Sequence, residues 1–151
     1  MAAFTPLNPD YEARVRASFA KQRAMHSLGI EMTALAPGRA ELAMAYDARF
    51  CQQHGFVHAG ILTTALDSAC GYAAFSLMPA DAAVLTIELK TNLLAPGRGA
   101  RFRFVGEVIK PGRTITVSEA RAFAATAEGE KLIATMTATL MAVRERDDVR
   151  E

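Results

Sequence analysis

The chain has 151 residues, of which 51% are hydrophobic and 22% are charged, and its formal net charge is +1. This length suits one domain with a sizeable core, and the near-neutral charge excludes a general nucleic-acid binder, which would carry a strong basic excess. The N-terminal residues show no apolar run behind a basic start, so we expect no signal peptide. Cys51 and Cys70 lack CxxC and zinc-type spacing. We therefore expect reduced thiols and a cytoplasmic protein.

The first predicted element is a helix over about residues 9–25. Asn8 is a suitable capping residue, Pro9 suits a first turn, and Asp10 places negative charge near the positive end of the helix. Gly29 is expected to end this region.

Six later stretches have the character of β-strands. Phe102 and Phe104 alternate with arginines, for example, as expected of a strand with one solvent-facing side. Turn dipeptides such as Pro37-Gly38 separate the stretches, and short turns between consecutive strands favour antiparallel hairpins. The predicted strands cover residues 30–35, 39–46, 84–94, 101–109, 114–125 and 131–143, and the predicted loop covers residues 47–57.

Residues 59–77 are predicted to form one long helix in which almost every side chain is apolar or small. A helix that is apolar all round must be enclosed by protein or by lipid. Asp67 lies near its middle, and a central Asp costs roughly 2.5–3.5 kcal/mol on membrane insertion, so we expect no membrane span. The predicted fold is α+β, with a curved antiparallel sheet wrapped around this long central helix.

The sequence contains no repeat, no linker and no change in amino-acid composition that would mark another domain. We predict a single domain over residues 1–143. The charged C-terminal tail, residues 144–151, is expected to be mobile.

The polar and smallest residues of the central helix share one face, because they recur three and four residues apart. They are Gly60, Thr63, Thr64, Asp67 and Gly71. The face carries one carboxylate and no cation. A buried carboxylate without a partner is costly and is often retained for chemistry. The structural alternative is that Asp67 reaches solvent or hydrogen-bonds a neighbouring Thr.

His58, Ala59 and Gly60 stand at the start of this helix, where backbone N–H groups of the first turn point outward. A helix N-terminus carries about half a positive charge and stabilises an oxyanion. Asp67 lies two turns further along the same face. A carbonyl on the helix end would therefore lie near a carboxylate, in the same subunit or in a partner. Such a pair is the minimum apparatus for attack on an acyl carbon.

The run from Gln52 to Ser68, followed by the segment TIELKTNLLAP that begins at Thr86, resembles the hotdog-fold acyl-CoA thioesterases of the phenylacetate-pathway (PaaI-like) family. That family typically shows His-Gly-Gly, then Leu-Ala-Asp with a small residue after it, then a strand with a Thr or Ser that ends in Leu-x-Pro. The matching runs here begin at His58 and Ala65 with the family spacing. The similarity covers nearly the whole chain and implies a single hotdog domain.

The resemblance also implies roles for particular residues. Asp67 is expected to be the general base or the nucleophile, and the backbone N–H of Ala59, beside Gly60, to polarise the thioester carbonyl. A Gly usually stands at the position of Ala59, so the methyl group here is a departure that would tighten the site.

Further residues match positions that contact the substrate in relatives. Gln52 is expected to contact the reacting centre, and Thr86 to hold the attacking water. His58 would orient its loop or help the leaving thiolate. Arg98 and Arg113, in two Pro-Gly-Arg turns, would bind the phosphates of CoA.

A metal site is the alternative for the loop before the central helix. His54 and His58 are four residues apart and could act with Cys51, but no further ligand has suitable spacing. We therefore expect no metal and no cofactor.

The predicted function is hydrolysis of acyl-CoA thioesters, with medium or long acyl chains favoured as substrates. The alternatives are a non-catalytic acyl-CoA or acyl-carrier-protein binding module and a hotdog hydratase or dehydratase. A curved sheet leaves its edge strands unpaired, and the resemblance implies a homodimer, usually a dimer of dimers, in which Asp67 faces the partner's 58–60 turn. Neither nucleic acid nor membrane is an expected partner.

Overall fold

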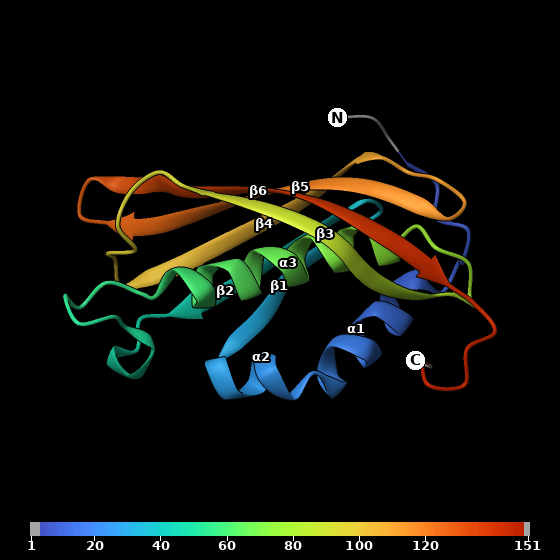
Figure 1. Cartoon of the computed structure of the whole chain (residues 1–151), viewed down its shortest axis with the longest axis horizontal. Helices are drawn as coiled ribbons and strands as arrows, with labels where there is room; N and C mark the ends of the chain where they lie inside the picture. Colours follow the sequence, from blue (N-terminus) through green and yellow to red (C-terminus); the bar gives the residue numbers. More distant parts are fainter. Residues whose placement is uncertain (1–3, 150–151) are drawn as a thin grey trace.

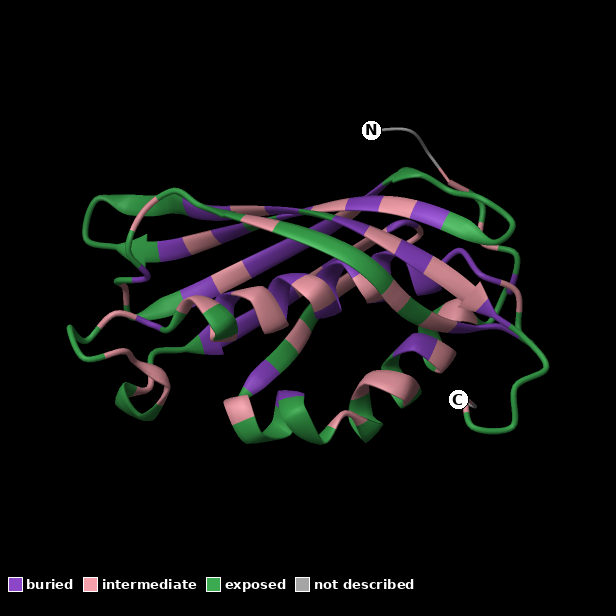
Figure 2. Cartoon of the chain, in the orientation of Figure 1, coloured by how far each residue is buried: buried purple, intermediate pink, exposed green. Residues whose placement is uncertain are grey.

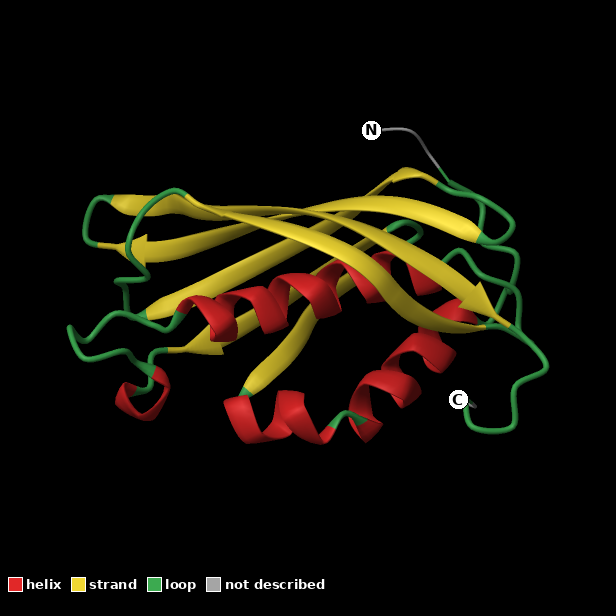
Figure 3. Cartoon of the chain, in the orientation of Figure 1, coloured by secondary structure: helices red, strands yellow, loops and turns green. Residues whose placement is uncertain are grey.

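The computed structural model describes residues 4–149, which form one sheet curved around a central helix (Figure 1). The helices are α1 (Tyr11–Lys21), α2 (Arg23–Leu28) and α3 (Ala59–Phe75), and a short 3-10 turn, η1 (Ala48–Phe50), lies in the predicted loop. The strands are β1 (Ile30–Ala36), β2 (Arg39–Ala45), β3 (Ala83–Leu93), β4 (Arg101–Lys110), β5 (Ile115–Thr126) and β6 (Gly129–Val143). Helices α1 and α2 lie on the side of α3 opposite β5 and β6 (Figure 3).

The strands of the described chain are ordered β1-β2-β4-β5-β6-β3, and each neighbouring pair is antiparallel. The predicted α+β hotdog fold is therefore confirmed. Each predicted strand boundary lies within two residues of the observed one. The order leaves β1 and β3 as the two edges of the sheet.

The N-terminal helix is broken, which corrects the single helix predicted over residues 9–25. The break falls at Gln22, whose ψ of 97° is extended. Val15 and Met25 are both fully buried. In one straight helix their directions would differ by about 80° at 3.6 residues per turn. The break allows both apolar side chains to reach the same core.

The two ends of this helical region differ in how they are capped. Asn8 accepts a hydrogen bond from the backbone N–H of Asp10 at 3.0 Å, and Asp10 precedes α1 without a side-chain cap. Asn8 therefore forms a local turn and does not cap the helix as predicted. Gly29 ends α2 in the left-handed conformation, with φ of 63°, as the sequence indicated.

Helix α3 lies directly against the sheet and ends at Phe75, two residues earlier than predicted. Small residues on its buried face, among them Ala65 and Ala69, have no exposed surface. Gly106 of β4 faces them, and an added Cβ there would collide with the backbone carbonyl of Ala69. The missing side chain at Gly106 is what allows the helix to pack this closely.

Strand β3 is a long edge that remains largely exposed (Figure 2). Ile87 and Leu93 expose 52% and 55% of their surface. The pairing register between β3 and β6 shifts between Thr86 and Glu88, so the strand contains a bulge at Ile87. An exposed apolar edge of this kind is a template for pairing with another chain.

The predicted C-terminal tail begins where β6 ends, at Val143. Residues 144–149 of that tail are described and lie outside the sheet. Residues 150 and 151, like residues 1–3, lie outside the described part of the chain, and the mobility of the tail stays a prediction.

Arg14 ties α1 to the segment that follows α3. Its guanidinium donates hydrogen bonds to the carbonyl oxygens of Pro79, at 2.8 Å, and Ala82. The same group stands 4.1 Å from the centroid of the Phe75 ring. The half-buried Arg14 therefore anchors the N-terminal helices to the C-terminal end of α3.

We predict that Arg14→Met lowers the free energy of unfolding by about 2–3 kcal/mol, because buried carbonyls lose a charged donor. Arg16→Met is the matched control, since the exposed ion pair of Arg16 with Glu12 is expected to contribute less than about 1 kcal/mol. Urea unfolding followed by circular dichroism measures both. Equal losses for the two variants would contradict the anchoring role of Arg14.

Candidate active site

Helix α3 runs antiparallel to β3, and its polar face lies against that strand. Thr63 donates a hydrogen bond to the hydroxyl of Thr91 at 3.4 Å, and four residues later Asp67 meets Thr86. The face predicted from the sequence is confirmed, because its members are half-buried or exposed whereas neighbours such as Leu66 are fully buried.

Asp67 is held by the strand rather than by a neighbour on its own helix. The Thr86 hydroxyl donates a hydrogen bond to Asp67 Oδ1 at 2.7 Å, next to the β-bulge at Ile87. No salt bridge to this carboxylate occurs within residues 4–149. A carboxylate accepts several hydrogen bonds, so the remaining oxygen positions of Asp67 are open to a water or a substrate. The two residues that the sequence placed in these roles therefore lie in contact.

The start of α3 leaves one backbone donor open. The ring Nδ1 of His58 accepts a hydrogen bond from the Gly60 N–H at 2.9 Å, which places the ring proton on Nε2. The N–H groups of Ile61 and Leu62 donate to the His58 carbonyl. The Ala59 N–H has no hydrogen-bond acceptor in the described chain. It is the first-turn donor at which a developing oxyanion can bind.

Gln52 lies in the loop before α3 and lines the same hollow as Ala59. Its backbone N–H donates to Phe56 O, at 2.9 Å, and its side-chain oxygen accepts from His54 N, which closes the loop before α3. Gln52 and Ala59 both line a hollow of about 410 Å³ between this loop and the end of β3, which we call the Ala59 hollow. The other lining residues are Phe56, Val57, Leu62 and residues 93–97.

The carboxylate and the open donor are far apart within one protomer. Asp67 follows Ala59 by eight residues, which is about 12 Å along a helix. One thioester carbonyl therefore cannot contact both groups of the same subunit.

The two arginines assigned to CoA phosphates lie at opposite ends of the protomer. Arg98 lines a cleft of about 850 Å³ together with Lys131, and its guanidinium stands 4.9 Å from the Phe56 ring centroid. This Arg98 cleft shares Phe56 and Pro96 with the Ala59 hollow. Arg113 lies in the β4–β5 turn near Met78, beyond the C-terminal end of α3.

A hollow of about 270 Å³ opens beside the catalytic candidate and contains residues that sequence analysis did not identify. We call it the Asp67 hollow. Ser18 of α1 and Gln22, at the break between α1 and α2, form part of its wall. Neither residue belongs to a sequence motif that would have marked it. The full lining is Ser18, Gln22, Asp67, Ser68, Gly71, Tyr72, Val84, Leu85 and Thr86.

Cys70 belongs to the buried side of α3. Burial raises the pKa of its thiol, with a smaller contribution from the charge of Asp67, so the thiol stays protonated at neutral pH. Cys51 is also unpaired. Across residues 4–149, no group of three His, Cys, Asp or Glu side chains is placed to hold a metal ion, and Cys51, His54 and His58 form none.

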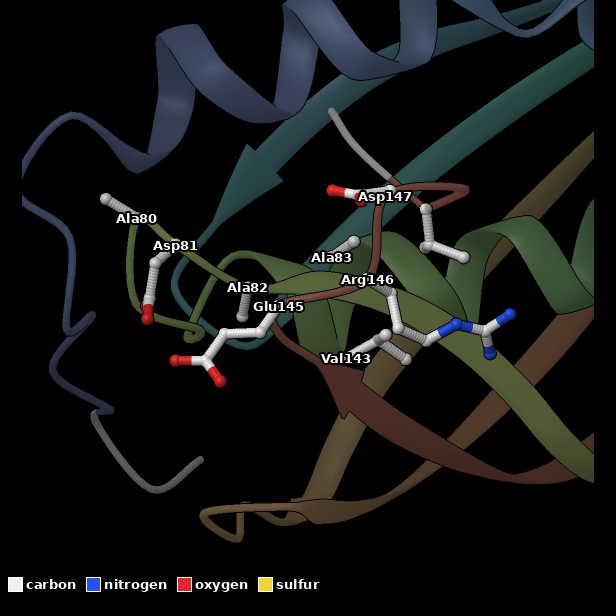
Figure 4. A pocket seen from close by; sticks show the side chains of 9 residues that line it. Ala80, Asp81, Ala82, Ala83, Val143, Glu145, Arg146 and Asp147 are labelled. Atoms are coloured by element: carbon white, nitrogen blue, oxygen red, sulfur yellow. The ribbon is translucent and has the colours of Figure 1, made fainter.

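A further hollow of about 450 Å³ lies where β3 begins and β6 ends (Figure 4). The carboxylates of Asp81 and Glu145 lie on one side of it, and the Arg146 side chain extends away from them. None of the predicted site residues lines this hollow. Among the described residues, no helix has both the length and the apolar character needed to cross a membrane.

A family model and a solved structure assign this chain to the same family. The family model described as the thioesterase superfamily matches residues 54–130. The crystal structure of a thioesterase family protein from Silicibacter pomeroyi is 58% identical, with a TM-score of 0.88 over 89% of this chain and 99% of that one.

More distant relatives agree with this match. A Saccharolobus solfataricus protein named as an esterase is 35% identical over 92 residues, which span 61% of this chain and 65% of that protein. The PaaI protein of the E. coli phenylacetic acid degradation operon is 20% identical, with a TM-score of 0.80 over 91% of this chain and 96% of that one. This last likeness concerns the fold alone.

Proposed function

Because the chain belongs to the thioesterase superfamily, we propose that it hydrolyses acyl-CoA thioesters at a site shared by two subunits. The observation that carries the proposal is the position of Asp67, a half-buried carboxylate that is held by Thr86 and opens onto a hollow. A carboxylate kept partly from water without a cation suits a general base or a nucleophile.

The proposed reaction needs few groups. A water held between Asp67 and Thr86 gives its proton to the Asp67 carboxylate while its oxygen bonds to the thioester carbon. The Ala59 N–H of the other subunit stabilises the negative charge on the carbonyl oxygen. The C–S bond then breaks, and the thiolate of CoA takes up the proton. In the second route Asp67 itself attacks and the resulting anhydride is hydrolysed, so that both routes require the ionised carboxylate.

Helix geometry supports a homodimer as the active form. A two-fold axis midway between Ala59 and Asp67 would pass near Thr63, which contacts Thr91 on the exposed edge β3. Pairing of β3 with the same strand of a second copy would cover apolar surface and bring each Asp67 towards the partner's Ala59. The resemblance implies that two such dimers join into a tetramer. The unpaired cysteines fit a reducing, cytoplasmic location.

The Arg98 cleft supports CoA as the thiol part of the substrate. It adjoins the Ala59 hollow, since Phe56 and Pro96 line both. Arg98 and Lys131 supply two positive charges for phosphate groups, and the neighbouring small residues leave room for a nucleotide. Arg113 would reach the same nucleotide only from the partner subunit.

The first prediction concerns the base. Asp67→Asn keeps the size of the side chain but cannot take a proton from water, so turnover should fall about 10²–10⁴-fold while acyl-CoA still binds. Asp81→Asn, an exposed carboxylate in the turn before β3, is the control and should keep wild-type turnover. Release of free thiol measures the rate, and calorimetry measures binding. If Asp67→Asn retains more than about a tenth of the turnover, a binding module becomes the better account.

The second prediction concerns the shared site. Ala59→Pro removes the open N–H at the first helical position, which tolerates Pro, and His58 with ψ of 138° accepts a following Pro. Turnover should fall about 10²–10³-fold with the helix intact.

Mixing the two inactive variants then tests the arrangement. In a dimer of one Asp67→Asn and one Ala59→Pro subunit, one site carries both changes and the other carries none. Refolding an equal mixture should therefore restore about a quarter of wild-type activity. No restoration would place both groups in the same subunit and contradict the shared site.

The third prediction concerns CoA. Arg98→Ala should raise the Michaelis constant for acyl-CoA about tenfold, because one charged phosphate contact is lost, and leave turnover nearly unchanged. An N-acetylcysteamine thioester, which lacks the nucleotide, should be hydrolysed as before. Arg113→Ala, measured in parallel, shows whether the partner's arginine takes part. An equal loss with both thioesters would assign Arg98 to folding instead.

A further inference from the structure

Tyr46 follows strand β2 and makes two hydrogen bonds that connect separate walls of the proposed site. Its backbone N–H donates to the carbonyl oxygen of Ala100 at 3.0 Å, and Ala100 lines the Arg98 cleft. Its side-chain hydroxyl donates to the carbonyl oxygen of Gly55 at 3.3 Å, and Gly55 lies in the tip of the loop before α3. Tyr46 therefore ties the tip of this loop to the segment that carries the cleft.

The loop before α3 is held differently at its base and at its tip. At the base, the N–H of His58 donates to Phe50 O at 2.9 Å, and Val57 forms a β-bridge on each side. At the tip, residues 52–56 form hydrogen bonds among themselves. The hydroxyl of Tyr46 supplies the one hydrogen bond that joins this tip to the rest of the described chain. Removing the hydroxyl would therefore free the tip and leave the base in place.

Phe56 follows the carbonyl that Tyr46 holds, and its side chain is a wall of two hollows. It lines both the Arg98 cleft and the Ala59 hollow. The guanidinium of Arg98 stands 4.9 Å from the centroid of its ring. Its own carbonyl accepts a hydrogen bond from the backbone N–H of Gln52. The hydroxyl of Tyr46 therefore helps to fix the backbone from which this shared wall projects.

The phenol of Tyr46 keeps its proton over the pH range of an activity assay. A hydrogen bond with the Cys51 side chain and partial desolvation raise the pKa of Tyr46 above its ordinary value. A protonated phenol donates a hydrogen bond, whereas a phenolate can only accept one. The donor to the Gly55 carbonyl is therefore present at neutral pH.

The inference rests on the proposed function, in which CoA lies over the Arg98 cleft and its thioester reaches the Ala59 hollow. A substrate that occupies both must pass Phe56, so its affinity depends on how often the loop holds this ring in place. When only a fraction of the molecules is competent to bind, the apparent affinity falls by that fraction. The N–H of Ala59 belongs to α3 and not to the loop tip, so the reacting groups would stay in place.

We propose that Tyr46 is a positioning residue for substrate binding: its hydroxyl, through the Gly55 carbonyl, keeps Phe56 between the Arg98 cleft and the Ala59 hollow. Phe56 contacts the thiol arm of the substrate, and Tyr46 contacts neither the substrate nor the reacting atoms. Loss of the hydroxyl is therefore expected to weaken binding and to leave the chemical step unchanged.

Tyr46→Phe removes only the hydroxyl, because the ring and the backbone bond to Ala100 remain. The Michaelis constant for octanoyl-CoA should rise about two- to tenfold, which is the change that one neutral hydrogen bond supports, with turnover within about twofold of wild type. Tyr11→Phe is the matched control and should keep both constants, since the Tyr11 hydroxyl makes no hydrogen bond within residues 4–149. An unchanged Michaelis constant, or a fall in turnover as large as that in kcat/KM, would overturn the proposal.

Two further readouts distinguish positioning from a general loss of stability. Amide hydrogen exchange followed by NMR should become faster in Tyr46→Phe for residues 52–56 and stay unchanged in β4 and β5. Phe56→Ala should itself raise the Michaelis constant, and Tyr46→Phe should then add nothing, because it acts through Phe56. Faster exchange throughout the sheet, or additive effects of the two substitutions, would assign Tyr46 to folding and overturn the proposal.

Binding of S-octyl-CoA, a thioether that cannot be hydrolysed, separates this proposal from the proposed function. In calorimetry, Tyr46→Phe and Phe56→Ala should each bind it more weakly than the wild type does. If octanoyl-CoA is not hydrolysed but these losses are found, hydrolysis fails and the positioning role stands. Equal affinities of the three proteins, or no binding by the wild type, would overturn the positioning role even in an active enzyme.

Discussion

The fold depends on enclosing a helix that is apolar on most of its surface. Burial of α3 needs a sheet that curves around it, and close approach needs small residues on both sides, Gly106 in β4 and the alanines of the helix. A sheet that curves around one helix must end in two free edges. One of these edges, β3, lies along the only polar face that α3 has in the described chain.

The same helix determines how the chemical groups are spaced. Its N-terminus supplies an open N–H at Ala59, and its polar face supplies the carboxylate of Asp67, about 12 Å away. A rigid helix cannot shorten that distance. In the proposed dimer, two copies related by a two-fold axis at the β3 edge would solve the problem, because each would place its own helix start opposite the other's carboxylate. In this account, covering the exposed edge and completing the site are one event.

The N-terminal helices contact both the core and the wall of the Asp67 hollow. Arg14 fixes α1 to the segment after α3, and the break at Gln22 allows Val15 and Met25 to share the core. The same break places Gln22 at the wall beside Asp67.

The sequence by itself determined the element order, the strand boundaries and the polar face of α3, because periodicity and turn residues act locally along the chain. The contact of Asp67 with Thr86 was foreseeable only through the family resemblance. The tertiary structure decided the break at Gln22, the hollow that Gln22 and Asp67 both line, and the placing of Arg98 and Lys131 in one cleft. Each brings together residues far apart in sequence, and such contacts depend on how the sheet curves and where the helices pack, which no local pattern encodes.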